Sequence, residues 1–248
     1  VSDDDDARAL VRRLDALGGG HEVLRRAAAR TLGTLDPPRA TELLSSLMRW
    51  SFERWEPAMR VLPAFMRALD EDGDVIPHLA QLRQVAMLHE QEDAGIVFTE
   101  GAPVLEYHAD AAARADARLL AMPLGVLKSR ARLTRNPDEL SRLAVASHAA
   151  VIREVLKNPR LTEDLVVRIA ARRPARPEPL EEIWRSPRWN TQPAVRRALV
   201  FNPYLPPAVA VKIAPTLSPS DLRALAEDRQ VHSSVRELAA RLSAAAAR

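Results

Sequence analysis

The chain has 248 residues, enough for a sizeable core in one or two domains, and 47% of them are hydrophobic, as in globular proteins. Cysteine is absent, which excludes disulfides, thiolate metal sites, iron–sulfur clusters and cysteine nucleophiles. Aromatic residues make up only 4%, whereas alanine, leucine and arginine are abundant, and this composition favours an all-α fold.

The net charge of +3 is unevenly distributed. Residues 1–122 carry 14 Lys and Arg against 21 Asp and Glu, whereas residues 123–248 carry 22 against 12. We therefore predict an acidic helical N-terminal region, 1–122, and a basic helical-repeat domain, 123–248, whose charge suits an acidic partner. No apolar run of 18 residues occurs and the first residues are acidic, so we expect no membrane span, no signal peptide and a cytoplasmic protein.

Apolar residues at helical spacing predict four helices in the first part of the chain, over residues 7–17, 22–32, 37–51 and 57–69. The four aspartates before them, 3–6, are expected to form a solvated start. Asp36 and Pro37 read as the N-cap and first residue of the third helix. Trp50, Phe52 and Trp55 are expected to form a hydrophobic corner.

The acidic run 70–74 has carboxylates spaced as in a calcium-binding EF-hand loop. It lacks the glycine at position six, which is Val75, and the closing glutamate at position twelve, which is Gln81. We therefore expect an acidic turn before a helix over 75–92. His78 and His89 lie eleven residues apart, too far along a helix to share a metal ion, so no metal site or cofactor is expected.

Residues 95–107 are the one stretch with strand character and are predicted either as a small β-hairpin or as a long loop. A further helix is predicted over 109–121. The sign of the charge changes here, so we place the domain boundary near 94–122.

The basic second half begins with a predicted helix over 124–133. Three-helix units then follow, the third of which lacks its last helix, as a terminal repeat would. Their first helices are predicted near 138–146, 178–185 and 219–227, their second helices near 149–157, 192–201 and 233–246, and their third helices near 163–172 and 207–215.

Two of these units repeat one motif at a spacing of 44 residues: Asn158-Pro159 corresponds to Asn202-Pro203. Proline disfavours the α conformation in the residue before it, so each preceding helix must stop at its asparagine. The motif predicts a helix–corner–helix joint, with Thr162 capping the next helix in the first copy. A fixed period of this size is typical of a stacked helical array.

The residues Val195-Arg196-Arg197-Ala198-Leu199-Val200-Phe201-Asn202-Pro203-Tyr204-Leu205-Pro206 resemble the Asn-Pro repeat of the bacterial leucine-rich repeat variant family, a member of the HEAT/armadillo-like α-solenoids. The similarity covers about 136–242, although the period of 40–44 residues is longer than in that family. It implies an all-α, right-handed α-solenoid that serves as a curved binding scaffold, and it names neither partner nor reaction.

We therefore expect a non-enzymatic scaffold that binds an acidic protein or peptide. Repeat-equivalent cations define the hypothetical binding ladder, with nearby arginines extending it: Arg153, Arg197, Arg168, Lys212, Arg172 and Arg173. Lys128, Arg130, Arg132, Arg135, Arg185 and Arg188 are further candidates.

Two alternatives stay open. The same ladder suits sequence-nonspecific nucleic-acid binding through phosphates. Solenoids of the HEAT-like DNA glycosylase type suggest, with less support, a base-flipping enzyme with Trp184 and Trp189 as aromatic walls and Glu181 or Glu182 as the carboxylate. The oligomeric state is not predicted.

Overall fold

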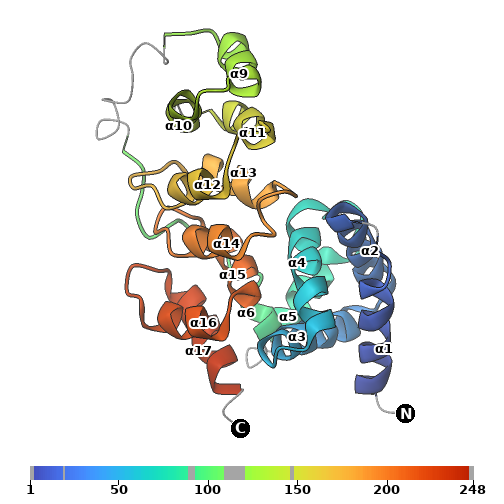
Figure 1. Ribbon diagram of the computed structural model, residues 1–248. Coiled ribbons are helices and arrows are strands. Elements are labelled where there is room, and N and C mark those ends of the chain that lie inside the picture. The colour runs from blue at the N-terminus through green and yellow to red at the C-terminus, as the bar shows by residue number, and fades with distance from the viewer. Residues whose placement is uncertain (1–2, 19, 89–92, 109–120, 146–147, 246–248) are drawn as a thin grey trace. The chain divides into compact units, whose positions relative to one another are not determined.

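The computed structural model describes residues 3–18, 20–88, 93–108, 121–145 and 148–245 (Figure 1). Within these ranges the protein is all-α, with 15 α-helices, one short 3-10 helix and no strand. The predicted all-α class is confirmed. The predicted helix over 109–121 and His89 lie outside the described residues.

Two compact units make up the chain. One unit joins residues 1–101 to residues 207–248, and the other consists of residues 102–206. The predicted division at residue 122 differs from this one, because the last helices of the chain pack with the N-terminal helices. The unit of residues 102–206 carries 18 Lys and Arg against 11 Asp and Glu, a net charge of +7.

In the first unit, helices α1 (Asp3–Asp15), α2 (Gly20–Thr34) and α3 (Pro37–Phe52) surround α4 (Glu56–Glu71). The aspartates that we expected to form a solvated start belong to the first turn of α1, where negative charge is stabilised by the helix dipole. Asp36 caps α3 as predicted, and its Oδ1 accepts a hydrogen bond from the Arg39 N–H at 2.9 Å.

The predicted hydrophobic corner is present where α3 meets α4. The rings of Trp50 and Trp55 make an edge-to-face contact at 5.3 Å, and Trp50 is only 1% exposed. The guanidinium of Arg8 lies over the Trp50 ring at 4.9 Å. Aromatic and cation–π contacts of this kind add to the burial of apolar surface and fix the angle between the helices.

Cations hold the acidic run that ends α4. Lys212 Nζ lies 3.0 Å from Asp70 Oδ1, and Arg67 Nε donates to Glu71 Oε1 at 2.8 Å. Arg25 pairs with Asp72. These partners stabilise carboxylates at a helix C-terminus, where the helix dipole alone disfavours them. Among the described side chains, no group of three or more His, Asp or Glu is placed to hold a metal ion.

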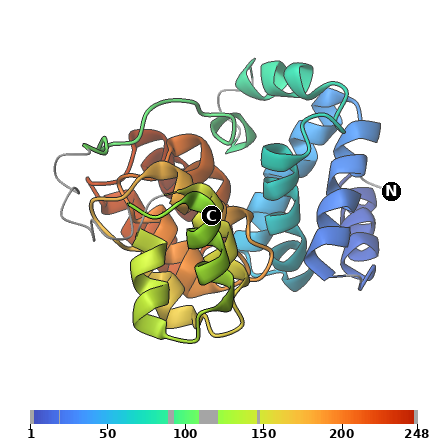
Figure 2. The same cartoon turned by 90° about the horizontal axis from the view of Figure 1, so that it is seen from above.

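Helix α5 (Leu79–Leu88) starts later than predicted, because Pro77 disfavours helical geometry at Ile76 before it. Residues 95–107 contain the end of α6 (Asp93–Ile96) followed by turns and irregular backbone, so the long-loop alternative is the one that forms (Figure 2).

The same unit also contains the last elements of the chain, which pack against α3, α4 and α6. These are α15 (Pro207–Ile213), the 3-10 helix η1 (Ala214–Thr216), α16 (Pro219–Glu227) and α17 (Ser233–Ala245).

Over residues 121–145 and 148–206, the second unit contains six helices whose limits agree with the predicted ones to within about two residues. They are α9 (Leu124–Leu133), α10 (Pro137–Val145), α11 (Ala149–Lys157), α12 (Glu163–Ala170), α13 (Pro177–Arg185) and α14 (Pro193–Val200). They follow one another along the unit in chain order (Figure 1).

These six helices pack in two rows. Helices α9, α11 and α13 form the first row, and α10, α12 and α14 form the second, with each helix contacting the next one of its row. Neighbours in the chain also pack between the rows, as α10 does on α11 and α13 on α14. The packing therefore repeats with every helix pair, whereas the sequence period of about 44 residues had suggested three-helix units.

Candidate functional site

The Asn158-Pro159 corner fastens α11 to the preceding helix of its row. Asn158 is 1% exposed. Its Nδ2 donates to the carbonyls of Ala131 at 2.9 Å and Thr134 at 3.0 Å, which lie in the last turn and at the C-cap of α9. Its Oδ1 accepts from the Arg160 N–H at 2.8 Å. The Asn158 side chain therefore satisfies carbonyls at the end of α9 that lack a partner within that helix. It also satisfies a backbone N–H in the turn after α11.

Asn202 repeats this arrangement in the second row. Its Nδ2 donates to the carbonyls of Ala170 at 2.7 Å and Arg172 at 3.0 Å, at the end of α12. Its Oδ1 accepts from the Tyr204 N–H at 3.0 Å. The predicted role of the Asn-Pro motif as an architectural joint is confirmed. Thr162 stands at the N-cap of α12 as predicted, but its side chain makes no capping hydrogen bond.

A third helix end docks in the first row by different chemistry. After α13, Trp189 Nε1 donates to the Leu156 carbonyl at 2.8 Å, and the Arg188 guanidinium donates to the carbonyls of Asn158 and Leu161, each at 3.3 Å. The guanidinium also lies 4.3 Å from the Trp189 ring. Arg188 is thus part of the joint between α11 and α13.

Two cations of the predicted ladder are tied up in ion pairs. Arg153 Nε donates to Glu182 Oε2 at 2.8 Å in a bidentate pair between α11 and α13, in which the carboxylate is 9% exposed. This hydrogen bond raises the pKa of Arg153. Lys212, paired with Asp70, has a side chain that is only 13% exposed and belongs to the other compact unit. The Lys212 ammonium is therefore largely shielded from a partner, whereas the Arg153 side chain is 56% exposed and already paired with Glu182.

The other four predicted residues lie in the second unit. Arg168 is exposed on α12. Three of them, Arg172, Arg173 and Arg197, lie around the corner at Asn202. The fold brings them together, although Arg197 is distant from the other two in the sequence. Arg173 donates to the Phe201 carbonyl at 2.6 Å, and the Arg197 guanidinium lies 4.9 Å from the Phe201 ring. Arg172 is joined to the corner through its carbonyl.

Sequence reasoning missed an aromatic residue beside this group. The Arg176 guanidinium lies 5.0 Å from the ring of Tyr107, which follows the loop that contacts the Asn202-Pro203 corner: the Leu105 N–H donates to the Pro203 carbonyl at 3.1 Å. Partial burial lowers the pKa of the Arg172 guanidinium, and Tyr107 acts on it in the opposite direction. Nothing in the local sequence of residues 102–108 indicates this docking.

Arginines also surround the corner at Asn158, where they line an open pocket of about 560 Å³. We call this the first-corner pocket; its lining consists of Arg132, Leu133, Thr134, Arg135, Asn158, Pro159 and Arg160. The three arginines are exposed, and no described acidic side chain lies within salt-bridge distance of them. Arg132 and Arg135 were among the sequence candidates, whereas Arg160 was hidden because its repeat equivalent is Tyr204.

The residues considered for a base-flipping site have other roles. Trp184 is fully buried, and Trp189 is bonded to the Leu156 carbonyl. Glu182 is in the ion pair with Arg153, and Glu181 accepts from Arg185 at 2.9 Å. Trp184, Trp189 and Glu182 thus serve packing around α13, and Glu181 forms an ion pair within α13.

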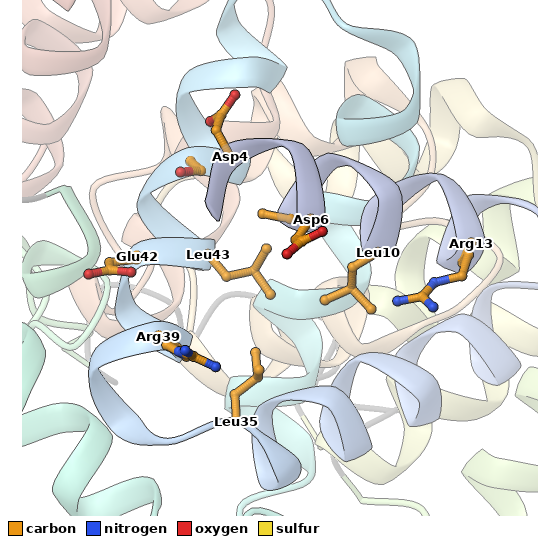
Figure 3. A pocket seen from close by; sticks show the side chains of 10 residues that line it. Asp4, Asp6, Leu10, Arg13, Leu35, Arg39, Glu42 and Leu43 are labelled. Carbon is orange, nitrogen blue, oxygen red and sulfur yellow. The ribbon is translucent and has the colours of Figure 1, made fainter. Parts of the chain in front are cut away.

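A second cavity, of about 480 Å³, lies in the other unit between α1, α3 and the turn before α3. Figure 3 shows Leu10, Leu35 and Leu43 converging on it, with charged side chains of both signs around them. Asp4 at its edge is already bonded to Arg8 at 3.0 Å. Because both signs of charge line this cavity, its electrostatics select no particular class of ligand.

Comparisons of the chain with protein-family models, curated proteins and solved structures give no significant match. In the part of the chain that the structure describes, no helix is long and apolar enough to cross a membrane. The candidate site therefore rests on geometry and charge alone: exposed arginines at the ends of packed helices in a basic unit.

Proposed function

We propose that this protein is a non-enzymatic binding scaffold, a right-handed α-solenoid of HEAT/armadillo-like character whose unit of residues 102–206 binds an acidic protein or peptide. Two rows of helices in which each helix packs on the next one of its row support the solenoid assignment. Such arrays offer a long surface built from helix ends and loops, which is suited to extended partners.

One observation carries the proposal: five exposed arginines of this unit lie at two corners where helices end. Arg132, Arg135 and Arg160 line the first-corner pocket, and Arg172 and Arg173 border the corner at Asn202. Buried asparagines fix the backbone at both corners. The cations are therefore held on a rigid frame, and rigid presentation reduces the entropy lost on binding.

The alternative, a nucleic-acid backbone, requires cations at regular intervals that meet successive phosphates. The ladder predicted for that purpose is interrupted, because Arg153 and Lys212 are paired with Glu182 and Asp70. The observations thus favour an acidic protein surface over a nucleic acid.

The test compares poly-L-glutamate with a random 20-base-pair duplex by fluorescence anisotropy, at about 50 mM and about 200 mM salt. We expect poly-L-glutamate to bind, and the double variant Arg135→Glu/Arg172→Glu to weaken its binding by about tenfold or more. The matched control is Arg223→Glu/Arg229→Glu, which changes the charge equally at exposed arginines of the other unit.

Equal weakening by the control pair would contradict the proposed surface. Tighter binding to the duplex than to poly-L-glutamate, with an affinity that collapses between the two salt concentrations, would establish the nucleic-acid alternative instead. Far-ultraviolet circular dichroism of each variant checks that helix content is unchanged.

A further inference from the structure

We propose that the first-corner pocket binds a phosphate monoester, carried as phosphoserine or phosphothreonine by a peptide segment of the acidic partner. This inference rests on the proposed function and names the chemical group that its basic surface selects.

Three arginines from two separate chain segments line this pocket. Arg132 belongs to the last turn of α9 and Arg135 to the link that follows, whereas Arg160 stands in the corner after α11. Asn158 joins the two segments, since its Nδ2 bonds the carbonyls of Ala131 and Thr134 while its Oδ1 bonds the Arg160 N–H. The backbone that carries the three arginines is thus set before any ligand arrives.

The charge of the pocket is unopposed. No Asp or Glu lines it. Glu139, which is not among the lining residues, accepts from the Thr134 hydroxyl at 2.5 Å and lies 3.6 Å from Arg130. Glu139 therefore contacts one lining residue, Thr134, and lies near Arg130, while the lining itself carries only positive charge.

The number of arginines favours a phosphate over a carboxylate. One arginine is sufficient to bind a carboxylate through two parallel hydrogen bonds. A phosphate monoester carries about −1.5 to −2 charges and three acceptor oxygens at neutral pH, so it can engage three guanidinium groups at once. Convergent arginines of this kind are a recurring means of recognising phosphorylated peptides.

An apolar neighbour favours a peptide as the carrier of the phosphate. Leu133 lines the same pocket and is 68% exposed, beside the exposed ring of Pro159. An exposed leucine among arginines can pack on an apolar side chain flanking the phosphorylated residue, a contact that a nucleic-acid backbone cannot supply. The pocket is also a single discrete site, whereas a duplex presents phosphates in series.

The experiment uses the full chain and a fluorescein-labelled pool of nine-residue peptides with central phosphoserine and degenerate flanks. The same pool with serine, the same pool with glutamate, and a ten-nucleotide single-stranded DNA are measured in parallel by anisotropy. We expect the phosphoserine pool to bind at least about tenfold more tightly than the other three.

Three single variants, Arg132→Gln, Arg135→Gln and Arg160→Gln, should each weaken binding of the phosphoserine pool by about fivefold or more. Arg132→Lys should also weaken it, because lysine keeps the charge but loses the planar fork. The control Arg223→Gln, an exposed arginine of the other unit, should leave it unchanged.

Equal binding of the phosphoserine and glutamate pools would overturn this inference and leave the acidic-partner proposal intact. Loss of binding to every peptide pool and to poly-L-glutamate would overturn both. Tighter binding of the DNA, lost in the same three variants, would assign the pocket to nucleic-acid phosphates and also overturn the inference.

Discussion

Asn158 and Asn202 perform the same structural task in two different rows of helices. Each is buried, each donates its amide to carbonyls at the end of the preceding helix of its row, and each accepts from the N–H two residues ahead. The distances to the first carbonyls are 2.9 Å for Asn158 and 2.7 Å for Asn202. Asparagine suits this position because its short side chain is both donor and acceptor.

Replacing Asn202 by alanine should lower the free energy of unfolding by about 2–3 kcal/mol, because buried carbonyls and one N–H lose their partner. Asn202→Asp should be at least as harmful, since it keeps the acceptor but sets a negative charge against carbonyls. Urea unfolding followed by circular dichroism measures the change. Asn136→Ala is the control: Asn136 also precedes a proline but is exposed, so its loss should cost below about 1 kcal/mol.

Breaking the pair between Lys212 and Asp70 should destabilise the unit that contains both. Lys212→Ala leaves a carboxylate that is 11% exposed without this cation, and we expect a loss of about 3 kcal/mol. The double variant Lys212→Met/Asp70→Leu should recover much of this loss, because neither charge of the pair then remains without its partner. Thermal unfolding of the two variants decides the matter; additive losses would show that the pair is not coupled.

Arg153 and Arg197 are equivalent in sequence but should differ in their effect on stability. Arg153→Ala leaves the buried carboxylate of Glu182 unpaired and should cost about 1–2 kcal/mol, a figure that allows for the 56% exposure of the arginine. Arg197→Ala removes a contact with the Phe201 ring but leaves the Arg153–Glu182 pair intact, and should cost less than Arg153→Ala. Equal losses in urea unfolding would contradict this assignment.

Stability should depend on pH through Glu22. Hydrogen bonding from Arg25 holds the pKa of the Glu22 carboxyl below its ordinary value. Its stabilising effect is therefore complete above the unfolded-chain pKa of about 4.3 and is lost as the pH falls through the lower folded-state pKa.

The variant Glu22→Gln should accordingly unfold at lower temperature than the wild-type protein at pH 7, and the difference should shrink as the pH falls from about 5 to about 3. Glu42→Gln, an exposed change on α3, is the control and should give no such trend. If the difference in unfolding temperature between Glu22→Gln and the wild-type protein stayed constant down to pH 3, the Glu22–Arg25 ion pair would not contribute to stability.

The sequence predicts the helices well because neighbouring residues in the chain set where each helix begins and ends. Asp36 with Pro37 begins α3, and Asn158 before Pro159 ends α11. Ion-pair partners that lie far apart in the chain cannot be predicted in this way. The repeat showed that Arg153 and Arg197 are equivalent, but nothing local places Glu182 beside Arg153, so the ion pair could not be predicted from the repeat.

The same limit applies to the grouping of helices. α12 and α15 occupy equivalent places in the repeat, yet α12 packs with α14, whereas α15 packs with α4. The apolar face of a helix shows that it has a neighbour and does not say which. The first-corner pocket combines both situations: two of its arginines were recognised from sequence, and Arg160 required the geometry.

The return of residues 207–248 to the N-terminal unit makes the basic unit an insertion. A Cβ added at Gly101 would lie 3.7 Å from Pro207, so the chain leaves and rejoins the surrounding unit at neighbouring points. Leu105 and Pro203 are hydrogen-bonded at the corresponding ends of the inserted unit. We therefore expect residues 102–206 to tolerate excision or transfer with short linkers, whereas truncating the chain at residue 206 would remove α15 and α17 from the helices against which they pack.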